Sequence, residues 1–215
     1  MKILLLGNSG SGKDFAADLF ELSAYIYAYK KQKSQIRFKY KIKNALFNYK
    51  TKGYIFESLK KARFAQPVKD FIHNTFKIPY EVLNSSDKNN FHITIKGKDV
   101  TIRELIIKIS EEFKNIFGEN IWVDSLFKNY SKYKDIIIVD GRFPNEFEEA
   151  KKRGFITIKL NSFKENKTDF GLNKVNEIPE YKIDYVLENN DSQLSLFKKI
   201  YKIYESEIEK ENCCS

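Results

Sequence analysis

Short runs of apolar residues alternate along the chain with longer segments in which apolar residues recur every three or four positions. The short runs have the length of buried strands, and the longer segments have the period of amphipathic helices. This alternation predicts an α/β fold with a mostly parallel sheet. The predicted strands are Lys2–Leu6, Ala62–Ala65, Ile136–Val139, Phe155–Leu160 and Ile183–Leu187.

The predicted helices have recognisable ends as well as the helical period. Residues 101–117 begin with Thr101 and Glu104, which are spaced as a capping box. The helix predicted over 144–153 begins with a proline, carries acids early and bases late, and ends at Gly154. The first of these two helices should bury Ile102, Leu105, Ile106, Ile109, Phe113 and Ile116.

The last predicted helix begins with Asp191 as its N-cap and runs to about Ile208. Its apolar residues share one helical face, so we expect that face to lie in the core. The residues expected to be buried are Leu194, Phe197, Ile200, Tyr201 and Tyr204.

Composition is that of a folded globular protein. Of 215 residues, 42% are hydrophobic and 31% charged, and only four are proline, so we expect a single domain over residues 1–212. The formal net charge is +9, but arginine stands at only five positions. We interpret the excess as a drift toward lysine and expect no nucleic-acid partner. The lysine-rich segment 27–61 is predicted to be a helical insertion. Its alternative is a surface for nucleic acid or for a partner, including a homodimer.

Cysteine usage and hydropathy indicate where the protein works. Cys213 and Cys214 are adjacent near the C-terminus, where they cannot cross-link a core, and this favours a reducing compartment. No apolar stretch has the length of a membrane span, and the apolar run at the N-terminus is too short for a signal sequence. We therefore expect a cytoplasmic protein that does not associate with a membrane.

The strongest chemical motif is Gly7-Asn8-Ser9-Gly10-Ser11-Gly12-Lys13, a match to the G-x-x-x-x-G-K phosphate-binding loop. It follows a predicted strand and precedes a predicted helix at Asp14–Leu22. Glycines let successive backbone N–H groups face phosphate oxygens, and the lysine reaches the terminal phosphates. ATP is the expected ligand, bound by Gly7, Ser9, Gly10, Ser11, Gly12, Lys13 and Asp14, and the alternative is a glycine-rich turn.

Two carboxylates and an arginine accompany this loop. Asp14 stands where a serine or threonine usually binds Mg²⁺, so we expect Asp14 to hold the metal or its water shell. Asp140 ends a buried strand, where a second carboxylate would face the same crevice. Arg142 follows and could stabilise charge during phosphoryl transfer. The catalytic residues predicted are Lys13, Asp140 and Arg142, and Asp14 is alternatively a simple first-turn acid.

The order of several further segments resembles the phage-type deoxynucleoside monophosphate kinases. The similarity covers nearly the whole chain except residues 27–61. Besides the phosphate loop, it rests on Arg63–Lys69 (RFAQPVK), Thr101–Leu105 (TIREL), Ile121–Val123 (IWV), Asp140–Glu146 (DGRFPNE) and Asp184–Asn190 (DYVLENN).

This resemblance implies a P-loop fold, with a five-stranded parallel sheet between helices, and transfer of the ATP γ-phosphoryl group to a deoxynucleoside monophosphate. It implies that Arg63, Lys69 and Arg103 lie near the acceptor phosphate, together with Arg142. Trp122 would shape the base or sugar pocket. From the residues alone, Lys69 is alternatively a solvated helix residue and Trp122 a core residue.

Three departures from the family pattern leave other functions open. Phe15 replaces a usual threonine, residues 27–61 are inserted, and the lid expected at 162–177 has Lys164, Lys167 and Lys174 but no arginine. One alternative is another small-molecule kinase, acting on a ribonucleotide or a coenzyme precursor. The other is a nucleotide-binding protein with little turnover.

Overall fold

The computed structural model describes residues 1–32, 59–85, 87–163 and 174–213. They form two compact units. One unit comprises 1–61 and 133–215, so it is built from both ends of the chain, and the other comprises 62–132. The expected insertion and lid therefore fall mostly outside the described residues.

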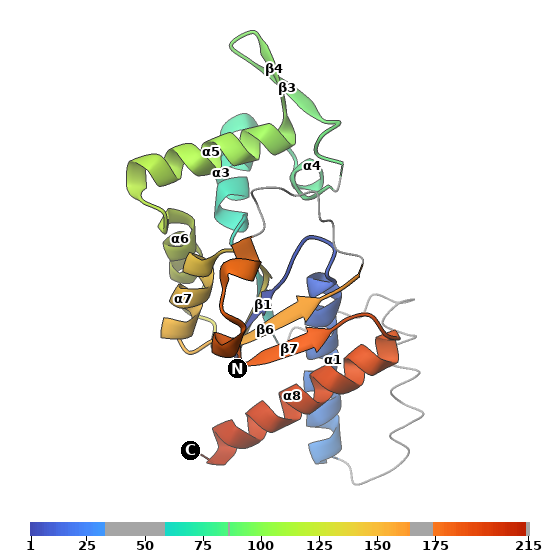
Figure 1. Ribbon diagram of the computed structural model, residues 1–215. Helices are drawn as coiled ribbons and strands as arrows, with labels where there is room; N and C mark the ends of the chain where they lie inside the picture. The colour runs from blue at the N-terminus through green and yellow to red at the C-terminus, as the bar shows by residue number, and fades with distance from the viewer. Residues whose placement is uncertain (33–58, 86, 164–173, 214–215) are drawn as a thin grey trace. The chain divides into compact units, whose positions relative to one another are not determined.

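The first unit contains a five-stranded parallel sheet flanked by helices, so the predicted α/β class is confirmed (Figure 1). β1 lies at its centre and runs parallel to both β5 and β6, and β6 runs parallel to β7. The strand order is β2-β5-β1-β6-β7. The strands are β1 (Lys2–Leu6), β2 (Lys60–Ala62), β5 (Ile136–Gly141), β6 (Ile156–Asn161) and β7 (Tyr185–Glu188).

The second strand was predicted at Ala62–Ala65, but it lies earlier in the chain. β2 begins at Lys60, whose N–H donates to Asp135 O at 3.0 Å. The chain then turns after Ala62, because Gln66 N donates back to Arg63 O at 3.0 Å and starts the next helix. Only Ala62 belongs to both the predicted and the observed strand.

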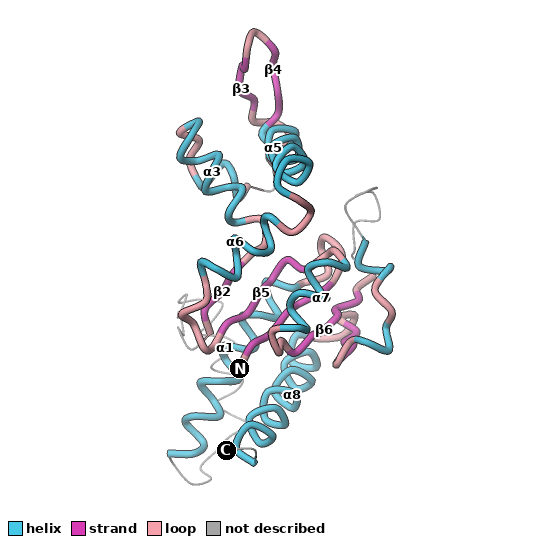
Figure 2. The backbone as a smooth tube through the Cα atoms, turned by 90° about the vertical axis from the view of Figure 1, so that its left-hand side faces the viewer, coloured by secondary structure: helices cyan, strands magenta, loops and turns pink. Residues whose placement is uncertain are grey.

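Helices cover both faces of this sheet. α1 (Lys13–Gln32) and α8 (Gln193–Cys213) pack together against one face, and α7 (Pro144–Lys152) lies on the other face (Figure 2). Because side chains alternate along a strand, Ile3 and Leu5 of β1 point toward α1 and α8. α1 is longer than the predicted helix Asp14–Leu22 and continues into the first residues of the expected insertion.

The start of α8 differs from the prediction. Ser192, not Asp191, accepts the first-turn hydrogen bond, from Ser195 N to Ser192 Oγ at 3.2 Å. Leu194 is 43% exposed, because at 3.6 residues per turn it lies beyond the edge of the buried stripe. That stripe consists of Leu196, Phe197, Ile200, Tyr201, Ile203 and Tyr204.

The second unit has its own core of helices and a hairpin. α5 begins with the predicted capping box, since Thr101 Oγ1 accepts from Glu104 N and Glu104 Oε2 accepts from Thr101 N. Ile116 is 68% exposed, contrary to the prediction, because the last turn of α5 extends beyond the buried cluster. The elements are α3 (Gln66–Phe76), α4 (Tyr80–Asn84), β3 (His92–Ile95), β4 (Lys98–Thr101), α5 (Ile102–Phe117) and α6 (Ile121–Asn129).

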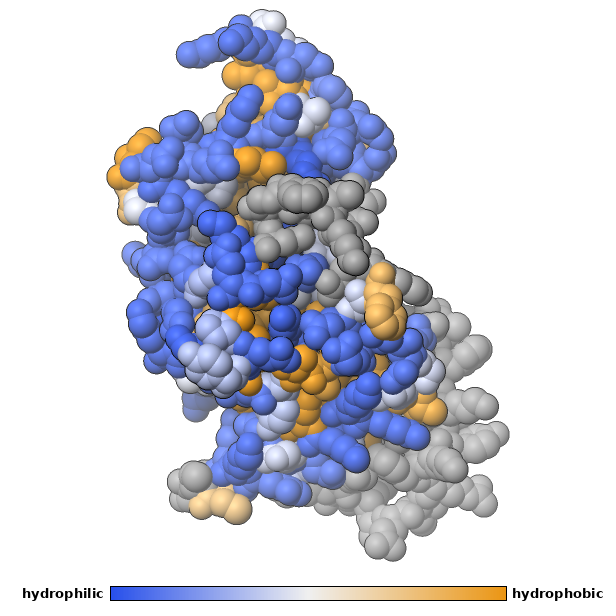
Figure 3. Space-filling view, viewed as in Figure 1, coloured by the Kyte–Doolittle hydropathy of each residue, from blue (hydrophilic) through white to orange (hydrophobic). Residues whose placement is uncertain are grey.

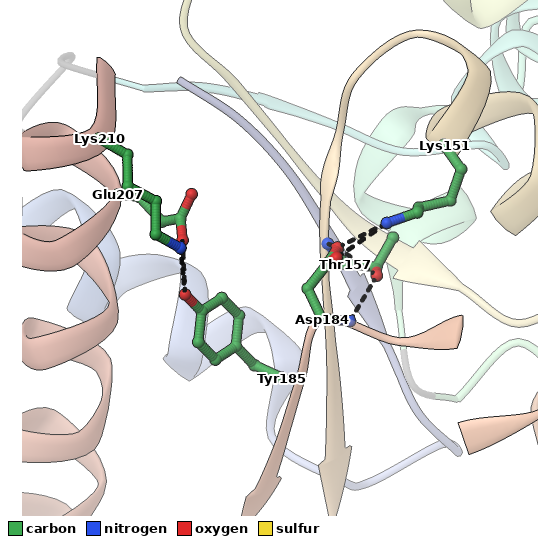
Figure 4. Close-up of polar contacts among 6 residues, drawn as sticks. All are labelled: Lys151, Thr157, Asp184, Tyr185, Glu207 and Lys210. Carbon is green, nitrogen blue, oxygen red and sulfur yellow. Dashed lines mark hydrogen bonds and ion pairs between the residues drawn. The ribbon is translucent and has the colours of Figure 1, made fainter. Parts of the chain in front are cut away.

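A polar cluster fastens β6 to β7 (Figure 4). Asp184 Oδ2 accepts from Thr157 N and Thr157 Oγ1, both at 2.8 Å, and Lys151 Nζ donates to Asp184 Oδ1 at 2.8 Å. Burial acts to raise the pKa of Asp184, but these hydrogen bonds outweigh it, so the pKa lies below its ordinary value. On the other side of β7, Tyr185 donates its hydroxyl proton to Glu207.

Among the described residues, none of the helices combines the length and the apolarity needed to cross a membrane. Hydrophilic side chains cover most of the described surface on the face drawn in Figure 3.

Two short 3-10 helices, η1 (Lys174–Glu177) and η2 (Glu180–Lys182), precede β7.

We expect the two leucines at the start of α8 to differ sharply in their effect on stability. Leu196 is 1% exposed, so Leu196→Ala should lower the free energy of unfolding by about 2–5 kcal/mol. Leu194→Ala, the same change two residues earlier, should alter it by about 0.5 kcal/mol or less. Urea denaturation of both variants measures this, and similar losses in the two would contradict the assigned phase of α8.

Asp184 should make stability depend on pH. Because its pKa is lowered by folding, its contribution is present at neutral pH and is lost as the pH falls through the folded-state pKa, below about 4. Asp184→Asn should therefore be less stable than the wild type at pH 7, with a difference that shrinks toward pH 3. Urea denaturation across this range tests it, and a difference that does not change with pH would contradict it.

Candidate functional site

The predicted phosphate loop joins the end of β1 to the start of α1, as the motif requires. A close approach fixes its first residue: a Cβ on Gly7 would lie 2.6 Å from Ser11 Oγ and 2.7 Å from Leu160 O. Further along, Gly10 and Gly12 have φ of 82° and 91°, in the left-handed region that favours glycine. The glycines of the motif therefore stand where the backbone needs them.

Lys13 is folded into this loop and is only 7% exposed. Its Nζ donates to Gly7 O and Asn8 O, both at 2.8 Å, and lies 3.4 Å from Ser11 Oγ. A buried ammonium group is tolerated only with such partners. The loop thus places a positive charge at its own centre, where phosphate groups would be attracted.

Asp140 lies at the same edge of the sheet as the loop. Gly7 N donates to Gly141 O at 3.4 Å, which joins the loop to the end of β5. The register of β1 and β5 shifts between Leu4↔Ile138 and Leu6↔Gly141, so Val139 and Asp140 together lie opposite Leu5. Such an irregularity re-aims side chains at the end of a strand. Asp140 is half-buried there, next to the point where the strand order reverses.

The turn that carries Arg142 is held by Glu146. Glu146 Oε2 accepts from Arg142 N at 2.7 Å and from Phe143 N at 3.0 Å, and the residue is 7% exposed. Glu146 is one of the acids that the sequence places early in this helix, and in the structure it caps the turn before the helix. Its spacing of three residues from Phe143, the residue before α7, is the signal that could have suggested a capping role.

Asn189 was also missed as a contributor to the site. It follows β7, and its Nδ2 donates to Ser11 O in the phosphate loop at 3.0 Å. Nothing in the local sequence predicts a contact across 178 residues. Only the position of β7 in the sheet brings the two together.

Phe15 and the lysines of the expected lid are two of the positions at which the sequence departs from the kinase pattern. Phe15 is half-buried and packs against the apolar core, which accounts for an apolar residue at this position. Lys174 is exposed at the start of η1, whereas Lys164 and Lys167 lie outside the described residues.

The residues predicted to bind the acceptor lie in the second unit. Arg63 and Arg103 are half-buried, Arg103 on the first turn of α5. Lys69 is on α3, and its Nζ donates to Asn84 Oδ1 at 2.9 Å. Their assembly into an acceptor site stays a prediction.

Trp122 lies in the core of this second unit and is 9% exposed. Its indole stacks on Phe113 with ring centroids 5.1 Å apart, and its Nε1 donates to Ser110 O at 3.1 Å. These contacts account for the indole as a packing residue, the alternative left open by the sequence. Its expected role in shaping a pocket stays a prediction.

The predicted Mg²⁺ ligands are Asp14 and Asp140. Asp14 is exposed on the first turn of α1, and Asp140 is the penultimate residue of β5, at the same edge of the sheet. Within the described part of the chain, no three His, Cys, Asp or Glu side chains gather as a metal-binding group. Carboxylate oxygens suit Mg²⁺, which commonly binds through one or two carboxylates together with substrate phosphates. The donor set therefore fits a metal that arrives with a nucleotide.

Comparison with protein-family models gives no match for this sequence, and comparison with curated proteins also gives none.

Removing the Glu146 carboxylate should destabilise the turn that carries Arg142. Glu146→Ala leaves the partly buried N–H groups of Arg142 and Phe143 without this acceptor, so the free energy of unfolding should fall by about 1–3 kcal/mol. Glu148→Ala, on the same helix, removes only an exposed ion pair with Lys182 and should cost about 1 kcal/mol or less. Chemical denaturation of the two variants makes the comparison, and equal losses would argue against the capping role.

Proposed function

We propose that this protein is an ATP-dependent phosphotransferase that transfers the γ-phosphoryl group to a deoxynucleoside monophosphate. One observation carries the first half of this proposal. A glycine loop between a central parallel strand and a helix encloses the ammonium group of Lys13, and Asp140 lies one residue before the end of the neighbouring strand. This is the arrangement that phosphate-binding loops use to hold nucleotide phosphates.

In this function, Lys13 would exchange its bonds to Gly7 O and Asn8 O for bonds to the β and γ phosphates of ATP. The backbone N–H groups of the loop and the N-terminus of α1 would hold the same oxygens. Arg142 would stabilise charge on the transferred group, on a turn that Glu146 keeps in place. These groups would act by positioning and by charge. No general base would be needed, because the acceptor phosphate is already ionised.

Asp14 and Asp140 would hold Mg²⁺, which supplies neutralisation of the charge between the phosphates. The nucleoside monophosphate would be bound by Arg63, Lys69 and Arg103, with Arg142. The deoxynucleotide acceptor rests on the resemblance in sequence order alone, because the phosphate loop by itself does not select an acceptor.

The proposal is tested by ADP release from Mg-ATP with each common deoxy- and ribonucleoside monophosphate as acceptor. We expect turnover with at least one deoxynucleotide, and a loss of about 100- to 1,000-fold in kcat for Lys13→Ala, because a charge at the transferred phosphates is removed. Lys202→Ala is the matched control, since Lys202 is exposed on α8.

The alternatives give different outcomes in the same assay. Turnover with ribonucleotides only would indicate a different small-molecule kinase. ATP binding without turnover on any acceptor would contradict the kinase and favour a nucleotide-binding protein. Turnover that survives Lys13→Ala would exclude the phosphate loop as its site.

A further inference from the structure

Asn189 and the phosphate loop fit each other closely. Asn189 Nδ2 donates to Ser11 O at 3.0 Å, and a Cβ built on Gly12 would lie 2.5 Å from the same Nδ2 atom. The amide could not approach the loop in this way if residue 12 had a side chain. Two features therefore require glycine at position 12: its φ of 91° and the close approach of Asn189.

The chain that carries Asn189 is itself fixed in place. Asn189 N donates to Asn161 O at 2.8 Å, which continues the pairing of β6 and β7 by one step. One residue later, Asn190 Oδ1 accepts from Phe163 N at 2.8 Å. The side-chain amide of Asn189 thus extends from a backbone that the end of the sheet holds in place. The position of Ser11 O relative to the sheet is fixed by this amide.

Anchoring this one carbonyl sets the direction of a neighbouring N–H group. A trans peptide is planar, so the C=O of one residue and the N–H of the next point in opposite directions. No described peptide bond is cis. With Ser11 O held toward Asn189, the N–H of Gly12 points to the opposite side of the peptide. Gly12 directly precedes Lys13, where α1 begins, so this N–H is among those that a helix N-terminus offers to an anion.

We propose that Asn189 is a positioning residue for nucleotide binding, which orients the Ser11–Gly12 peptide so that the Gly12 N–H can donate to a phosphate oxygen. The inference rests on the proposed function, because it requires that the loop binds nucleotide phosphates. It assigns to the segment after β7 a part in binding phosphate, which the motif at the N-terminus does not reveal.

The test compares ADP binding by the full chain and its variants by isothermal titration calorimetry. Asn189→Ala should raise the Kd for ADP about tenfold, since it removes one oriented contact with phosphate. Asn189→Asp keeps the shape of the side chain but turns a carboxylate oxygen toward Ser11 O, so it should raise the Kd further. Asn161→Ala is the matched control, because Asn161 Nδ2 contacts Glu188 rather than the loop.

Two further readouts separate positioning from a merely structural role. In the phosphotransfer assay, the KM for ATP should rise with the Kd while the KM for the acceptor stays within about twofold of wild type. The melting temperature without nucleotide reports stability alone. A lowered melting temperature with an unchanged Kd for ADP would overturn the inference.

The behaviour of the wild type distinguishes a failure of this inference from a failure of the proposed function. If the wild type binds ADP and Asn189→Ala binds it within about twofold as tightly, the positioning role is wrong and the function stands. If the wild type neither binds ADP nor transfers a phosphoryl group, the proposed function is wrong and this inference falls with it.

Discussion

The two hydrogen-bonded neighbours of β1 fix the point at which the predicted phosphate loop begins. On one side, Gly7 N donates to Gly141 O of β5. On the other side, Leu160 O of β6 lies so near that Gly7 has no room for a Cβ. The chain is therefore held between two strand ends as it leaves the sheet. Among the described residues, Lys13 follows Gly7 in the loop and Asp140 precedes Gly141 in β5, so both take their positions close to this constraint.

Around this edge, polar side chains are used to orient backbone groups. Glu146 holds the N–H groups of Arg142 and Phe143, and Asn189 holds the carbonyl of Ser11. Each contact fixes the orientation of a peptide before any ligand arrives. Groups oriented in advance need not reorganise when charge develops, which is the condition for effective electrostatic stabilisation.

Local patterns predicted the parts of the fold that local physics decides. The strand at Lys2–Leu6 and the capping box at Thr101 were each readable from a few neighbouring residues, and so was the position of the glycine-rich loop between a strand and a helix. Two predictions were wrong: the burial of Leu194 in α8, and the bounds of the second strand. Both depend on the packing partners of a helix end or an edge strand, and tertiary structure sets those partners. Asn189 was missed for the same reason: its contact with Ser11 depends on strand order, which no short motif encodes. For Glu146, the spacing of three residues from Phe143 does indicate a capping role.

The order of the strands also has a consequence for how the protein is made. In the described sheet, β1 has β5 on one side and β6 on the other, so Lys2 must wait for Ile136 before it can pair with β5. A ribosome adding about 5–20 residues per second needs on the order of ten seconds to supply that partner. During that interval the apolar run Ile3–Leu6 has been synthesised but has no strand beside it. The nascent chain must therefore be kept from aggregating through its first strand, and pairing across such a long loop makes completion of the central sheet a slow, late step of folding.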